Sequence, residues 1–168
     1  MCYFHEIPPR KLNRGGKCDR IPRQTFLWKR IGGMHRMKQA LVYQPDEKIR
    51  MAQRSFMEAL GIRIRTVEET ELSEPIGKLL GLPTGNGAAD GEGMAPGLPV
   101  PPVTVLAGFT EEDLDGFLGA RKTAGFRGMG LLSVVTPANI SWSLRRLGFE
   151  LFLEHEEIRK RESSAKKP

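Results

Sequence analysis

The pattern strand, helix, strand, helix occurs twice in this sequence of 168 residues, and it constrains the fold more than any other feature. In the first unit, the apolar run at residues 40–43 predicts a strand covered on both faces, and the i, i+3, i+4 spacing over 47–60 predicts an amphipathic helix. Apolar and charged residues alternate over 62–67, which indicates an edge strand, and residues 75–82 predict a short helix.

The second unit repeats this order. Residues 103–109 predict a strand, and the next helix is expected to begin at Thr110, which can form a capping box with Asp113. Residues 131–135 predict the fourth strand, and the last helix is expected to span about residues 141–161.

Two such units predict an α/β fold with a small, four-stranded, mainly parallel sheet. Each half supplies strand, helix, strand, helix, joined by right-handed crossovers, and a flavodoxin-like strand order, 2-1-3-4, is our first choice. We expect all four strands to run parallel.

Residues 37–162 are predicted to form this single α/β domain, because both units lie within them. Residues 83–102 separate the units and are rich in Gly and Pro, so we expect a flexible linker there. Residues 163–168 are expected to be a disordered tail.

Residues 1–36 are expected to be a disordered basic tail, because they show neither a helical nor a strand period and scatter Lys and Arg among isolated aromatic residues. A second interpretation starts from the glycine pair that precedes Met34 and Met37. Two glycine codons can spell a bacterial ribosome-binding element, so translation could begin at Met37, or else at Met34, in place of Met1. Both interpretations stay open.

The formal net charge of +6 comes from the ends of the chain. Residues 1–38 hold 10 Lys and Arg against 2 acidic residues, whereas residues 39–158 hold 11 against 17. Nucleic-acid association through the basic termini is therefore an alternative function and not the leading one. The sequence shows neither a secretion signal nor an apolar run long enough for a membrane span, so we expect a cytoplasmic protein.

No cofactor and no metal site are predicted. Cys2 and Cys18 lack the spacing of metal ligands, and no Gly-x-Gly-x-x-Gly motif follows a strand. No nucleophile, acid and base form a recognisable set, so an enzyme is not the expected class, and a small-molecule enzyme is kept as the third alternative.

The candidate binding residues follow the predicted strands at their carboxyl ends, where open α/β sheets bind ligands. Helix N-termini begin at the same edge and favour an anion, so a small anionic ligand or a protein partner is expected there. The opposing interpretation is that the polar side chains only cap helices and that the tryptophan anchors the core. The candidates are Gln44, Asp46, Thr110, Thr136, Asn139 and Trp142.

Two motifs resemble a known family. Residues 108–115 read Gly-Phe-Thr-Glu-Glu-Asp-Leu-Asp, and residues 134–139 read Val-Val-Thr-Pro-Ala-Asn, with Trp142 shortly after. Together they are similar to the bacterial and archaeal family called domain of unknown function 3783, over roughly residues 103–158. This resemblance implies no activity.

The last helix carries two apolar lines. Residues 147, 148, 151, 155 and 158 share one face, which includes His155, and Trp142, Phe149 and Leu153 form a second line roughly opposite. Either Gly148 splits this helix into two segments, or the second line packs on another subunit and the protein is a homodimer. The leading prediction is a non-enzymatic module that binds its ligand or partner near the turn at residues 136–142.

Overall fold

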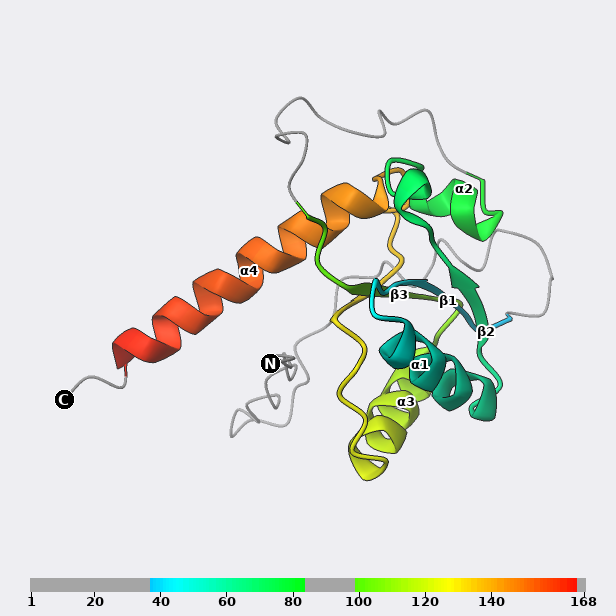
Figure 1. The fold of residues 1–168 in the computed structure, drawn as a ribbon, viewed down its shortest axis with the longest axis horizontal. Coiled ribbons are helices and arrows are strands. Elements are labelled where there is room, and N and C mark those ends of the chain that lie inside the picture. The colour runs from blue at the N-terminus through cyan, green and yellow to red at the C-terminus, as the bar shows by residue number, and fades with distance from the viewer. Residues whose placement is uncertain (1–36, 84–98, 166–168) are drawn as a thin grey trace, which may run out of the picture.

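The computed structural model describes residues 37–83 and 99–165, which form one four-stranded sheet with helices on both faces (Figure 1). The predicted α/β class is confirmed. In chain order the elements are β1 (Gln39–Tyr43), α1 (Glu47–Ala59), β2 (Arg63–Thr66), the 3-10 helix η2 (Glu69–Glu71), α2 (Ile76–Leu80), β3 (Val103–Ala107), α3 (Glu111–Thr123), β4 (Leu131–Val134) and α4 (Leu144–Ala165).

The strand order β2-β1-β3-β4 confirms the predicted order 2-1-3-4. Strand β1 pairs parallel with β2, and β3 pairs parallel with β4. The central pair β1/β3 is antiparallel, so the prediction that all four strands run parallel is wrong, and the sheet departs from the flavodoxin-like arrangement.

The chain enters β3 at Val103, which lies opposite Tyr43 at the carboxyl end of β1. Helix α2, with 5 residues, does not return the chain to the amino end of β1 as the crossover helix of a parallel βαβ unit does.

The two halves are related by a pseudo-two-fold axis at the centre of the sheet. Helices α1 and α3 are both 13 residues long, β1 and β3 both 5, and β2 and β4 both 4. The central register is symmetric about the pair Leu41 and Val105. Equivalent backbone contacts also cross the axis on the α2 side, where Pro75 forms a bridge with Ser143.

Each face of the sheet has its own hydrophobic core. Helices α1 and α3 cover one face (Figure 1). On that face Met57 and Phe117 pack against Ala40, Val42 and Leu106. On the opposite face, α2 and the first turns of α4 pack against a second set of strand side chains. This second core contains Leu41, Ile76, Leu79, Val103, Val105, Leu144 and Leu147.

Helix α4 runs without interruption from Leu144 to Ala165, so Gly148 does not split it. Its start lies three residues later than expected, because Ser143 is held in the bridge to Pro75. Gly148 lets the helix approach Val100, which is buried at the end of the predicted linker segment. Residues 84–98 of that segment, and residues 1–36, lie outside the described residues. The C-terminal part of α4 extends away from the sheet (Figure 1).

A pair of glycines tests the close approach of the chain at the start of β4. Gly125 and Gly130 both have positive φ, 63° and 65°, but only at Gly130 would a Cβ overlap the carbonyl group of Pro102. We expect Gly125→Ala to lower the free energy of unfolding by about 1–2 kcal/mol, the cost of the left-handed conformation alone. Gly130→Ala should cost clearly more in chemical denaturation. Equal losses would show that the strand start moves freely.

Candidate functional site

The six candidate residues do not gather at one edge of the sheet. Gln44 and Asp46 follow β1 at its carboxyl end. Because β3 runs antiparallel to β1, Thr110, which follows β3, lies at the opposite end of the strands. Thr136 follows β4, which is parallel to β3, and so lies on the Thr110 side. The single strand-end edge that the sequence predicted is therefore not formed.

Gln44 and Asp46 support the start of α1. The Gln44 side chain is 5% exposed, and its Nε2 donates to the Gly128 carbonyl at 3.3 Å while its Oε1 accepts from the Asp46 N–H. The Asp46 carboxylate in turn accepts from the Ile49 N–H at 3.0 Å. Both polar groups are used to connect α1 with the loop before β4.

Thr110 and Asp113 form the predicted capping box at the start of α3. The Thr110 hydroxyl oxygen accepts from the Asp113 N–H, and the Asp113 carboxylate accepts from the Thr110 N–H. Lys38, just before β1, donates to the same carboxylate at 2.6 Å. These donors, with Lys38 the largest contributor, lower the pKa of Asp113 from 3.8 to about 2.

Thr136 and Asn139 form a second reciprocal pair after β4. The Thr136 N–H donates to Asn139 Oδ1 at 2.8 Å, and the Asn139 N–H donates to the Thr136 hydroxyl at 3.3 Å. Asn139 Nδ2 also donates to the Val134 carbonyl, and the residue is only 7% exposed. Its side chain therefore fixes the turn by bonding the backbone at Val134 and at Thr136.

Trp142 is partly buried against the core that α2 and α4 share. Its carbonyl accepts from the Ile76 N–H at 2.9 Å, and the Arg146 guanidinium lies 4.1 Å from the centre of its ring. Trp142 thus joins the turn to α2 through its backbone carbonyl and to the first turn of α4 through its ring.

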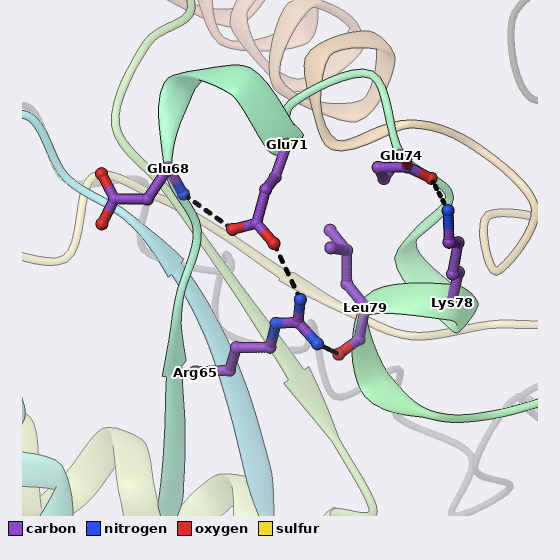
Figure 2. A network of polar contacts seen from close by, with 6 residues as sticks. All are labelled: Arg65, Glu68, Glu71, Glu74, Lys78 and Leu79. Carbon is purple, nitrogen blue, oxygen red and sulfur yellow. Dashed lines mark hydrogen bonds and ion pairs between the residues drawn. The ribbon is translucent and has the colours of Figure 1, made fainter.

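In the first half, a network of charged side chains links the edge strand β2 to the η2 and α2 helices (Figure 2). Arg65 on β2 donates to the Leu79 carbonyl at 2.7 Å and to the Glu71 carboxylate at 2.9 Å (Figure 2). Glu71 also accepts from the Glu68 N–H, and these contacts lower the pKa of Glu71. Glu68 and Glu71 are the structural counterparts of Thr136 and Asn139, as both pairs form reciprocal boxes after a parallel edge strand.

In the second half, the edge strand β4 lies beside a cavity. This cavity, of about 160 Å³, lies along the outer side of β4, between α3 and α4. Most of its lining is apolar, with Arg121, Glu154 and His155 as the charged or titratable members. The lining comprises Leu114, Leu118, Arg121, Gly130, Leu131, Leu132, Ser133, Val134, Leu151, Glu154, His155 and Ile158.

Sequence reasoning did not identify this cavity as a site. It did place Leu151, His155 and Ile158 on one face of the last helix, and that face does line the cavity. The signal that could have revealed the site is the composition of β4, Leu-Leu-Ser-Val, which carries no charge although the strand lies at an edge.

Within residues 37–83 and 99–165, no helix is long and apolar enough to cross a membrane. The same part of the chain contains no group of three or more His, Cys, Asp or Glu side chains that could hold a metal ion.

Substitution of Asn139 and of its counterpart Glu71 tests whether the Asn139 side chain stabilises the turn after β4. Asn139→Ala leaves the partly buried Thr136 N–H and Val134 carbonyl without their side-chain partners, so we expect a loss of about 1–3 kcal/mol in the free energy of unfolding. Glu71→Ala removes the more exposed counterpart and should cost less than about 1 kcal/mol. Chemical denaturation measures both, and the reverse ranking would contradict this role of Asn139.

The titration of Asp113 gives a second test. We expect NMR to show the Asp113 carboxyl titrating near pH 2, and Lys38→Met to raise that midpoint. Because the folded-state pKa lies below the ordinary value of 3.8, the carboxylate favours the folded state above about pH 4. This contribution is lost as the pH falls through 2. An unchanged midpoint in Lys38→Met would mean that the ion pair does not form in solution.

A family model described as domain of unknown function (DUF3783) matches residues 102–158. The matched segment begins just before β3 and ends within α4, so it is the second half of the sheet together with the β4 edge. No curated protein and no solved structure matches the chain at a significant level. The chain thus contains a DUF3783 domain over residues 102–158.

Proposed function

We propose that this protein is a cytoplasmic, non-enzymatic interaction module in which β4 accepts a strand from a protein partner. The observation that carries this proposal is the uncharged outer edge of β4, which opens into the apolar cavity between α3 and α4. The site lies immediately before the turn at residues 136–142, near which the sequence predicted binding.

The backbone of β4 supports strand addition. The N–H groups of Leu131 and Val135 donate toward β3, to Pro102 and Leu106 respectively. Residues of a strand alternate between its two sides, so the N–H groups of Leu132 and Val134 point outward. Strand β4 is last in the order, and no strand among residues 37–83 and 99–165 pairs with its outer side.

The pseudo-two-fold axis supplies an internal comparison. Strand β2, the counterpart of β4, is also an edge, but it carries the exposed residues Arg63 and Arg65. Charged side chains on an edge strand oppose pairing with another chain, and Arg65 is in addition held in the network to Glu71 and Leu79. The two edge strands therefore differ in charge, and β4 is the one that carries none.

The alternatives have less support. An anionic ligand at the Thr136 turn would compete with the backbone bonds that Thr136 and Asn139 already make. At the Thr110 edge it would meet the acidic first turn of α3. Nucleic-acid association would depend largely on the basic residues 1–36, which lie outside the described residues.

A photo-crosslinking experiment tests this proposal. A photoreactive phenylalanine analogue is placed in the full chain at Val134 on β4, or at its counterpart Thr66 on β2, and the cells are irradiated. We expect a discrete protein adduct from position 134 only. Adding Leu132→Pro, which removes an outward N–H, should abolish that adduct. The absence of any adduct at 134, or adducts that are equal at both edges, would contradict strand addition at β4.

A further inference from the structure

We infer that the strand added to β4 is the β4 strand of a second copy of this chain, in an antiparallel pairing centred on Ser133. This inference rests on the proposed function, in that it names the partner of the same edge. The result would be a two-fold dimer with one sheet running through both copies.

The β4 sequence is complementary to itself in this register. Leu132 lies opposite Val134 of the second copy, and the outward N–H of Val134 donates to the Leu132 carbonyl. The Val134 carbonyl already accepts from Asn139 Nδ2, and its second lone pair accepts from the Leu132 N–H of the second copy. Val134 is 36% exposed in the single chain, and Leu132 of the copy would cover it with an apolar side chain. Two uncharged Ser133 residues face each other on the axis, so no like charges meet.

The fold already joins its two halves in this way. At the centre of the sheet, β1 and β3 pair antiparallel about Leu41 and Val105, with α1 and α3 on the same face. A β4 to β4 seam would repeat that geometry at the outer edge. A two-fold contact of this kind uses the same surface on both subunits and closes on itself.

Helix α4 provides a second surface for the same dimer. Its 22 residues span about 33 Å, and beyond Leu151 it exposes Phe152 at 42% and Leu153 at 57%. Covering these exposed apolar side chains would remove apolar surface from water, so this part of α4 gains from a partner. A two-fold axis through Ser133 keeps both α4 helices on one face of the sheet and antiparallel.

Charge along α4 fits an antiparallel neighbour. Residues 150–157 contain four Glu and no Lys or Arg, whereas residues 159–161 are Arg, Lys and Arg. Two antiparallel copies bring the basic end of one helix toward the acidic stretch of the other. At the far edge, Arg63 and Arg65 on β2 oppose further pairing, so assembly stops at the dimer.

The molar mass of the full chain in solution tests this inference. Light scattering over a range of concentrations should give twice the chain mass for the wild type. Val134→Lys on the strand and Leu153→Glu on the exposed part of α4 should each shift the equilibrium to the monomer. Thr66→Lys, the matched change on β2, should leave the dimer intact. A wild type that is monomeric throughout, or a dimer that survives both variants, would overturn the inference.

Disulfide formation tests the register of the two paired β4 strands. In a chain with Cys2→Ser and Cys18→Ser, we add Ser133→Cys on β4, or Arg63→Cys on β2 as the control. Residues facing each other across the axis in a non-hydrogen-bonded antiparallel pair have Cα atoms about 4.5 Å apart, close enough for a disulfide. We expect a covalent dimer from position 133 only, and equal yields from both positions would contradict the register.

The two proposals fail differently. A monomeric wild type that still gives a position-134 adduct with another protein, lost in Leu132→Pro, would remove the dimer and keep strand addition. The absence of every adduct at position 134, together with a monomeric chain, would remove both.

Discussion

The antiparallel pairing of β1 and β3 is the constraint on which the rest of this structure depends. It places the pseudo-two-fold axis at Leu41 and Val105, so the two halves meet through a symmetric seam. It also sends the carboxyl ends of β1 and β3 to opposite edges. Within residues 37–83 and 99–165, β1 and β3 therefore do not share the strand end at which parallel sheets bind ligands.

The β1/β3 pairing also explains how the family match relates to the fold. Residues 102–158 contain β3, α3, β4 and part of α4, which is one half of the sheet. In this chain, residues 37–83 supply the other half, with a helix of equal length to α3 and a capped turn after the edge strand. Half of a two-faced sheet leaves a central strand edge unpaired, and β1 covers that edge of β3.

Symmetry makes the differences between the halves informative. After β2, the chain forms a five-residue helix, and Arg65 bonds its last turn to the edge strand. After β4, the chain forms a helix of 22 residues, and the edge strand carries no charge. The long helix and the uncharged edge strand are the two features on which the proposed strand addition and dimer rest.

The sequence alone determined the local structure. The element order, the capping box at Thr110, the apolar face of α4 and the DUF3783 similarity all follow from residues close together in the chain, since helix periods and caps act over three or four positions. Only the tertiary structure decided the direction of β3, because its pairing with β1 joins segments that lie far apart in the chain. Through that direction, it also decided that Gln44 and Thr110 lie apart. The cavity beside β4 combines Leu118, Leu132 and Leu151 from three elements, and no local pattern specifies that they meet.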